Sequence, residues 1–257
     1  MGTRILGEFD YLRPHTIEEA LSLLGKYGDK ASILAGGTDL LIKMKLLQVK
    51  PEYLVDITAI PKLRSISFDE KDLRVGTTVL LSELETSKVI QENYTALFEA
   101  ICEMATTQVR NIATIGGNLC NASPAADTAP PLLVLEAKIN IATQSGIRTV
   151  PLEDFFVGPG NTVLAAGDIL TGISIAPPSQ HMGTSFVRIS RTSSDLAKLN
   201  VAAALTTHNG ICEDAKIALG AVAPTPIRAK RAEAILKNRK LNQDAIDEAA
   251  DMVGEEI

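Results

Sequence analysis

The chain has 257 residues, of which 46% are hydrophobic and 22% charged, and this is enough to build one large domain or two unequal ones. Its formal net charge of −6 argues against nucleic-acid binding, which normally needs a basic face. No apolar run approaches the ~20 residues that span a bilayer, and residues 1–10 lack the apolar core of a signal peptide. We therefore expect a cytoplasmic protein without membrane insertion.

The first part of the chain predicts alternating helices and strands. Thr16 and Glu19 form a capping box that opens an amphipathic helix. Residues 31–35 predict a buried strand that ends at a Gly-Gly step, and a helix follows from 40 to about 47. Further along, we expect a strand at 53–57, a hairpin of 63–68 and 73–77, helices at 81–91 and 95–105, and a helix from about Thr128 with Pro130 and Pro131 in its first turn.

The pattern changes after residue 177. Residues 138–143 and 147–150 predict a hairpin, and 169–175 predict a strand that ends at Pro177-Pro178, which we take as a domain boundary. The chain thus divides into residues 1–177 and 178–257. In the second part, alternating runs at 185–189, 199–207 and 215–221 predict an antiparallel sheet, and 228–236 and 243–253 predict helices.

The three cysteines and the three histidines are dispersed along the chain. No cysteine belongs to a CxxC pair, so we expect neither a zinc site nor an iron–sulfur cluster held by this chain alone. Free cysteine is among the most buried residue types, so we expect three buried thiols, and we expect the histidines to lie at the surface or in packing. These residues are Cys102, Cys120, Cys212, His15, His181 and His208.

Two Gly-Gly steps, Gly36-Gly37 and Gly116-Gly117, each follow an apolar stretch. Glycine lets the backbone adopt positive φ and approach a ligand closely, and successive N–H groups in such a turn form an anion-binding concavity. The first step also opens a helix, whose N-terminus favours negative charge. Together the two steps could hold the two ends of a pyrophosphate, although each alone is more typical of a tight turn in a mixed α/β domain. Neither matches GxGxxG or GxxxxGK(S/T).

Two aspartates lie near these steps. Asp39 is expected to be a helix cap, because an anion site would not place a bare carboxylate against its ligand. Asp127 follows a Ser-Pro turn and could either cap a helix or accept hydrogen bonds from ribose hydroxyls. The spacing alone does not separate these two roles.

Four segments, taken in chain order, resemble signatures of the FAD-binding subunit of the molybdenum hydroxylases, the family of xanthine, carbon monoxide and nicotinate dehydrogenases. They are residues 35–40, residues 114–119 with 123–127, residues 189–198 and residues 221–228. The resemblance covers nearly the whole chain. It implies an α+β fold: a two-subdomain FAD-binding module of the vanillyl-alcohol-oxidase (PCMH) type in residues 1–177. A small α+β C-terminal domain with an antiparallel sheet would follow in residues 178–257. Relatives usually continue further, which either a truncated or a shorter natural end would explain.

The resemblance also implies one non-covalent FAD. It assigns the pyrophosphate to backbone amides of residues 34–40 and 114–118, and the ribityl or ribose side to Asp127. It places Ala105 in the cofactor slot, Ile169 or Leu170 near the flavin ring, and Lys198 at the pyrimidine edge, although spacing alone fits a Lys198–Asp195 ion pair. The expected cofactor-binding residues are Leu34, Ala35, Gly36, Gly37, Thr38, Asp39, Leu40, Ala105, Thr114, Ile115, Gly116, Gly117, Asn118, Asp127, Ile169, Leu170 and Lys198.

The implied function is electron transfer within a multi-subunit oxidoreductase. A large subunit would carry the molybdenum cofactor, and a small subunit would carry iron–sulfur clusters of the 2Fe-2S type. This chain would pass their electrons through FAD to NAD or another acceptor, with no catalytic residue and no metal of its own. The scattered cysteines argue against the branch of 4-hydroxybenzoyl-CoA reductases, which has an extra cluster in this subunit. The alternatives are a stand-alone flavin oxidoreductase of the same fold and a non-enzymatic scaffold or interaction protein.

Overall fold

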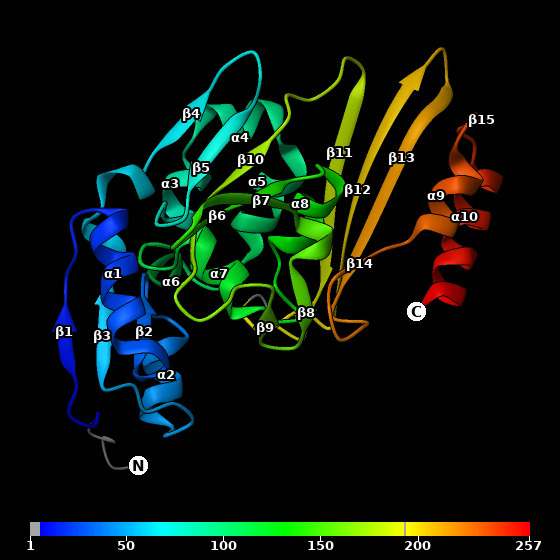
Figure 1. Cartoon of the computed structure of the whole chain (residues 1–257). Helices are drawn as coiled ribbons and strands as arrows, with labels where there is room; N and C mark the ends of the chain where they lie inside the picture. Colours follow the sequence, from blue (N-terminus) through cyan, green and yellow to red (C-terminus); the bar gives the residue numbers. More distant parts are fainter. Residues whose placement is uncertain (1–5, 193) are drawn as a thin grey trace.

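The computed structural model describes residues 6–192 and 194–257. The expectation for residues 1–10 therefore falls partly outside the described residues, as does Ser193 within the signature at 189–198. In the described ranges, no helix is long and apolar enough to cross a membrane. Figure 1 shows three layers in chain order: a small N-terminal subdomain, a central sheet with helices, and a C-terminal sheet with two helices at the far end.

The N-terminal subdomain is a parallel sheet of order β1-β3-β2 with helix α1 packed on it. The capping interaction predicted for α1 forms, because Glu19 N donates to Thr16 Oγ1 at 3.1 Å. The Glu19 carboxylate, however, accepts from His15 N at 2.8 Å and not from Thr16 N. The elements are β1 (Asp10–Leu12), α1 (Ile17–Tyr27), η1 (Gly28–Lys30), β2 (Ala31–Leu34), α2 (Leu40–Lys45), β3 (Tyr53–Asp56), η2 (Ile57–Ala59) and η3 (Pro61–Leu63).

The central subdomain is an antiparallel sheet of order β4-β5-β10-β6-β7. Both hairpins predicted from the sequence form here. Its strands are β4 (Ile66–Phe68), β5 (Leu73–Gly76), β6 (Lys138–Thr143), β7 (Gly146–Pro151) and β10 (Ile169–Ile175), and the short pair β8 (Phe156–Gly158) and β9 (Asn161–Thr162) follows η4 (Leu152–Asp154).

Six helices fill the space beside this sheet. The single helix expected over 81–91 is two helices, because the chain turns at Thr86, whose hydroxyl donates back to Ser82 O at 3.0 Å. The predicted helix with two prolines in its first turn forms. The helices are α3 (Leu81–Glu85), α4 (Lys88–Asn93), α5 (Thr95–Glu103), α6 (Thr107–Arg110), α7 (Ile115–Asn121) and α8 (Ala129–Val134).

The C-terminal part is the predicted antiparallel sheet, in the order β11-β12-β13-β14, with β15 also paired to β13. One face packs on α5 and α8, and α9 packs on β13 and against α10. The helix expected from 228 begins at Lys230, because residues 227–228 pair with β13. The elements are β11 (Met182–Ile189), β12 (Leu199–His208), β13 (Ile211–Gly220), β14 (Ile227–Arg228), α9 (Lys230–Leu236), β15 (Arg239–Lys240) and α10 (Gln243–Glu256).

The main hydrophobic core continues across the connector at 176–181, where we propose the domain boundary. Buried side chains of the C-terminal sheet, namely Phe186, Ala202, Ala204 and Ala218, belong to the same cluster as the buried residues of α5 and α8. A separate cluster lies between β13, α9 and α10. The C-terminal sheet therefore closes one side of the larger core.

Candidate functional site

A cavity of about 240 Å³ lies where the N-terminal and central subdomains meet. Its walls are the segment from β2 to α2, the first turns of α7, and the start of β10. The structure brings together here most of the residues that the sequence predicts to bind the cofactor. They are Ala35, Gly36, Gly37, Thr38, Asp39, Leu40, Thr114, Gly116, Gly117, Ile169 and Leu170.

The cavity wall also contains residues that sequence reasoning missed. For Lys43 a signal was present, because it follows Leu40 by three residues and so shares its helix face. A similar signal was present for Cys120 and Asn121, which lie in α7 four residues after Gly116 and Gly117, and for Ile33, which precedes Leu34 in β2. The remaining three come from segments that only the tertiary fold brings to this place. The missed residues are Ile33, Lys43, Ile57, Thr77, Cys120, Asn121 and Leu164.

The loop after β2 presents backbone donors that the protein itself does not use. Within the described residues, the N–H groups of Gly36, Gly37, Thr38 and Asp39 have no acceptor. Gly37 has φ +72°, which L side chains rarely adopt, and a Cβ on Gly36 would lie 2.2 Å from Ile112 O. These two glycines shape a loop that lines the cavity, and its N–H groups, which no described residue accepts, are available for an anion-binding concavity.

The second Gly-Gly step is not a turn but the first turn of α7. Thr114 is the N-cap, and its hydroxyl accepts from Gly117 N at 3.0 Å. The N–H groups of Ile115, Gly116 and Asn118 donate to the carbonyl oxygens of Val79, Thr77 and Thr114 at 3.0–3.1 Å. The expected free amides at 115–118 are therefore absent, because the protein already satisfies all four.

The packing of α7 explains its glycines. A Cβ on Gly116 would lie 1.7 Å from Thr77 Oγ1 and 2.7 Å from Thr77 O, whereas a Cβ on Gly117 would meet only Thr114 Oγ1 at 2.8 Å. Neither residue has a positive φ. Gly116 is needed for close packing on the loop after β5, and Gly117 is part of the cavity wall.

Asp39 occupies the N-cap position of α2 but does not cap the helix. Its Oδ1 accepts from Asn121 Nδ2 at 3.0 Å, and Asn121 Oδ1 accepts from Lys43 Nζ at 2.6 Å. The sequence thus predicts the position of Asp39 correctly, but the expected capping hydrogen bond does not form. The three side chains link α2 to the end of α7 along the cavity wall.

The thiols differ from the expectation of three buried groups. Only Cys212 is buried, while Cys102 and Cys120 are exposed. Cys120 is exposed toward the cavity, and protein atoms surround its thiol on the other sides. Desolvation by these atoms raises the pKa of the thiol to about 12. The neutral thiol therefore predominates at neutral pH.

Two of the dispersed histidines come together, since the ring centroids of His181 and His208 lie 6.0 Å apart. In the part of the chain that the structure describes, no group of three or more metal-ligating side chains surrounds them or any other point. The histidine pair therefore does not form a metal centre of the usual kind.

A second group of nominated residues gathers around Arg188 of β11, where the C-terminal sheet meets α5. Asp127 is only 6% exposed, accepts from Asn200 Nδ2 at 2.7 Å and lies 3.6 Å from Arg188 Nε. Arg188 also donates to the carbonyl oxygens of Glu103 and Asp195. Burial raises the pKa of Asp127, and the contacts with Asn200 and Arg188 only partly oppose this.

Ala105 and Lys198 belong to the segments that Arg188 ties together. Ala105 lies two residues after the end of α5 and has φ +50°. Lys198 is exposed, and its N–H donates to Ile189 O at 2.8 Å. Asp195 pairs with Arg191 at 2.9 Å, so the Lys198–Asp195 ion pair allowed by spacing does not form.

Three other nominated residues lie beside the cavity but not in its wall. Leu34 ends β2, and Ile115 is only 1% exposed within the core. Asn118 Oδ1 accepts from the hydroxyl of Thr128 at 2.6 Å. These side chains support the elements around the cavity.

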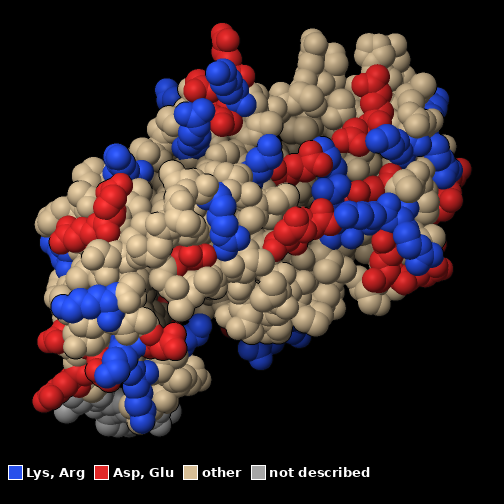
Figure 2. Space-filling model, in the orientation of Figure 1, with Lys and Arg blue, Asp and Glu red and all other residues tan. Residues whose placement is uncertain are grey.

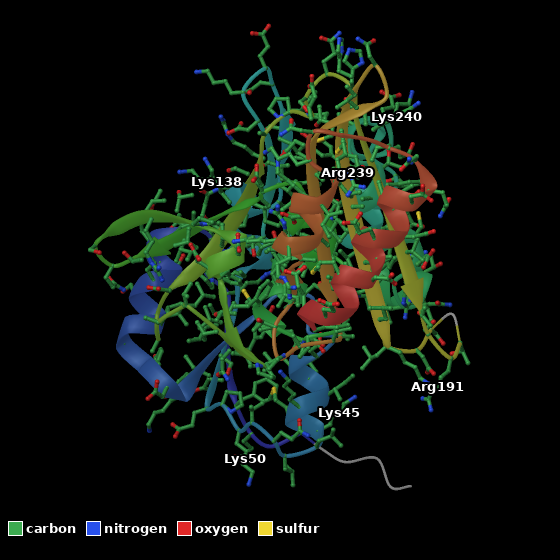
Figure 3. All side chains as sticks on the ribbon, turned by 90° about the vertical axis from the view of Figure 1, so that its right-hand side faces the viewer. Lys45, Lys50, Lys138, Arg191, Arg239 and Lys240 are labelled. Atoms are coloured by element: carbon green, nitrogen blue, oxygen red, sulfur yellow. The ribbon has the colours of Figure 1, made fainter. Side chains whose placement is uncertain are left out.

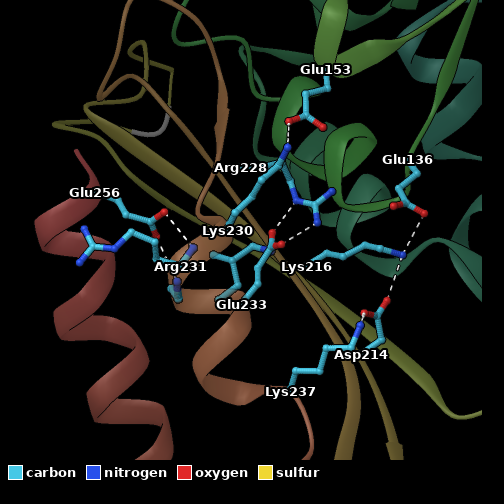
Figure 4. A network of polar contacts seen from close by, with 12 residues as sticks. Glu136, Glu153, Asp214, Lys216, Arg228, Lys230, Arg231, Glu233, Lys237 and Glu256 are labelled. Atoms are coloured by element: carbon cyan, nitrogen blue, oxygen red, sulfur yellow. Dashed lines mark hydrogen bonds and ion pairs between the residues drawn. The ribbon is translucent and has the colours of Figure 1, made fainter.

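A second hollow of about 450 Å³ lies between α9, β13 and the central subdomain, and it is strongly charged. Figure 4 shows its side chains paired across the hollow. Lys216 bridges Glu136 and Asp214 at 3.0 and 3.2 Å, and Lys230 pairs with Glu153. Over the whole face in Figure 2, basic and acidic side chains are interspersed. The hollow therefore joins two parts of the protein and offers no uncompensated charge to a ligand.

Comparison with known proteins agrees with this geometry. The family description "FAD binding domain in molybdopterin dehydrogenase" matches residues 7–178, and "CO dehydrogenase flavoprotein C-terminal domain" matches residues 184–257. The xanthine dehydrogenase FAD-binding subunit of Escherichia coli O157:H7 is 34% identical over 250 residues, covering 96% of this chain and 85% of that one. The carbon monoxide dehydrogenase medium chain of Hydrogenophaga pseudoflava is 32% identical over 243 residues, covering 95% and 85%.

Solved structures show the same fold. A carbon monoxide dehydrogenase from Hydrogenophaga pseudoflava, lacking the Mo-pyranopterin moiety of its cofactor, matches with a TM-score of 0.94 and 34% identity, covering 96% of this chain and 86% of that one. Quinoline 2-oxidoreductase from Pseudomonas putida 86 matches with a TM-score of 0.92 and 31% identity, covering 98% and 87%. The expected α+β fold and the family resemblance are confirmed. This chain belongs to the family of FAD-binding medium subunits of the molybdenum hydroxylases, and it is the flavoprotein component of an oxidoreductase.

Proposed function

We propose that the chain is the electron-transfer subunit between iron–sulfur clusters on a small partner subunit and NAD or another acceptor. A large partner subunit carries the molybdenum cofactor. The names of the relatives, an FAD-binding subunit and a medium chain, support such an assembly. The observation that carries the proposal is a row of four N–H groups, in residues that line the cavity, for which the described part of the chain provides no acceptor.

The residues present fit a flavin dinucleotide. The N–H groups of Gly36, Gly37, Thr38 and Asp39 would hold the diphosphate oxygens. Apolar side chains on the opposite side, among them Ile169 and Leu170, would pack on uncharged parts of the cofactor. When bound, FAD supplies redox chemistry that no side chain offers.

The residues around Arg188 would hold the rest of the cofactor, because a cavity of about 240 Å³ is small beside the ~300–1,000 Å³ of ordinary ligand sites. Asp127 Oδ1 is engaged by Asn200, while Oδ2 accepts no hydrogen bond from the described residues and would accept a ribityl or ribose hydroxyl. Ala105 would line the slot, and Lys198 would place a cation at the pyrimidine edge of the flavin.

The test is the flavin content of the full chain purified with the proteins that accompany it. We expect one FAD per chain, released completely into the supernatant by acid, because the cavity wall offers a largely protonated Cys120 thiol and no histidine. Co-purification with a larger molybdenum-containing and a smaller iron–sulfur chain is expected as well. A colourless chain would support the scaffold alternative, and a yellow chain that is active without partners would support the stand-alone enzyme.

A further inference from the structure

Lys43 provides the only basic side chain among the described residues that line the cavity. Asp39 provides the only acidic one, so the side-chain charges of this wall sum to zero. A diphosphate would bring negative charge into a space whose other donors, among them backbone N–H groups and threonine hydroxyls, are uncharged. Charge-assisted hydrogen bonds are roughly twice as strong as neutral ones, so the position of the ammonium matters.

A hydrogen-bonded chain holds this ammonium without neutralising it. Lys43 Nζ donates to Asn121 Oδ1 at 2.6 Å, and Asn121 Nδ2 donates to Asp39 Oδ1 at 3.0 Å. The amide thus engages the carboxylate, and Lys43 and Asp39 form no direct ion pair within the described residues. An ammonium has three N–H donors, and the other two donors of Lys43 have no acceptor in the same part of the chain.

The arrangement also joins the two walls of the cavity. Lys43 lies in α2 and Asn121 is the last residue of α7, so their contact spans 78 positions in the sequence. Lys43 is half-buried, which limits the screening of its charge by salt. The Lys43 ammonium is therefore held beside the loop whose four N–H groups find no acceptor among the described residues.

We propose that Lys43 is a further cofactor-binding residue, the counter-charge of the FAD diphosphate, and that Asn121 positions it. This inference rests on the proposed function, since it concerns the same cavity. It predicts that the cavity favours FAD over riboflavin, which lacks phosphate, partly through this one side chain.

The experiment titrates the flavin-free full chain with FAD and with riboflavin at two salt concentrations. We expect Lys43→Met to weaken FAD binding about tenfold, equivalent to about 1.4 kcal/mol, to reduce the salt dependence of FAD binding and to leave riboflavin binding unchanged. Lys43→Arg should retain most of the affinity. Lys45→Met is the matched control, because Lys45 lies on the same helix, is exposed and does not line the cavity (Figure 3).

Each outcome decides between two statements. Equal FAD affinity in Lys43→Met and Lys45→Met would overturn the role of Lys43, as would equal losses for FAD and riboflavin, which indicate a change of cavity shape. The unfolding midpoint without flavin shows whether the Lys43→Met variant is folded. If Lys43→Arg binds FAD as weakly as Lys43→Met, the role of Lys43 as a counter-charge is overturned, even when Lys43→Met is not folded. A wild-type chain that binds no FAD would contradict the proposed function itself.

Discussion

The two Gly-Gly segments have the same central residues but differ in the hydrogen bonding of their backbone N–H groups. The loop at 36–39 leaves four N–H groups without acceptors in the described residues, whereas the first turn of α7 satisfies its N–H groups through Thr114 and the loop after β5. Gly37 has a positive φ, while Gly116 lacks a side chain because Thr77 occupies that space. A glycine pair therefore indicates close approach, and only the partners of its amides show whether a ligand or the protein itself approaches.

The largest effect should come from Gly116→Val. Its Cβ would fall 1.7 Å from Thr77 Oγ1 and 2.7 Å from a backbone oxygen. Overpacking typically costs about 1–3 kcal/mol and occasionally more, and contacts this short place the substitution at the upper end. We expect an insoluble or largely unfolded chain, measured by denaturant unfolding without flavin. A wild-type free energy of unfolding would contradict the packing role of this glycine.

Gly37→Val should reduce FAD affinity more than it reduces the stability of the fold. A side chain at φ +72° costs about 1–2 kcal/mol, and relief of this strain would move the N–H groups away from the cavity. We expect FAD affinity to fall at least as far as in Lys43→Met. The matched control is Gly210→Val, which has φ +78° in open space away from the cavity. Equal FAD affinity in the two variants would show that the loop is only a turn.

Gly117→Ala should have a smaller effect on both properties. The new methyl group would press on Thr114 Oγ1, which caps α7, and loss of an N-cap interaction typically costs about 1 kcal/mol. FAD binding should weaken less than in Gly37→Val, because no donor to the diphosphate is lost. Titration of the flavin-free variant measures this, and a loss as large as that of Gly37→Val would mean that α7 also donates to the cofactor.

The smallest effect is chemical and concerns Cys120, at the end of α7. Because burial raises the pKa of its thiol to about 12, alkylation should be slow at pH 8 and rise about tenfold per pH unit toward that value. FAD should protect the thiol, since Cys120 lines the cavity. The Cys102→Ser chain removes the other exposed thiol for mass spectrometry. Fast alkylation that FAD does not slow would place the cofactor elsewhere.

Local patterns predicted much of the fold. The cap at Thr16, the strand at 169–175 and the C-terminal meander form as expected because each depends on neighbouring residues. The family signatures also led to most of the cavity wall. The partners of the amides of residues 115 and 116 could not be predicted, because Thr77 and Val79 reach α7 only through the tertiary fold.

The same limit applies to charged groups. Asp39 follows a strand and begins a helix, which is typical of an N-cap, but Asn121 from a distant helix takes its carboxylate. Arg188 lies two residues after the buried Phe186, so the alternation of β11 places both on one face, but nothing local shows that its partner there is Asp127. A charged side chain pairs with groups that are close in space, whereas sequence spacing predicts only the pairs that lie within one helix or strand.

The Asp127–Arg188 contact has a consequence for how the molecule unfolds. To separate the C-terminal sheet from the helices beneath it, the chain would have to expose both of these buried groups to water together with Phe186 and the small residues of the shared core. Water would solvate the two polar groups, but exposure of the apolar core that both parts share is unfavourable, so neither part gains by melting first. We therefore expect both family-matched regions to denature as one cooperative unit, with a single calorimetric transition.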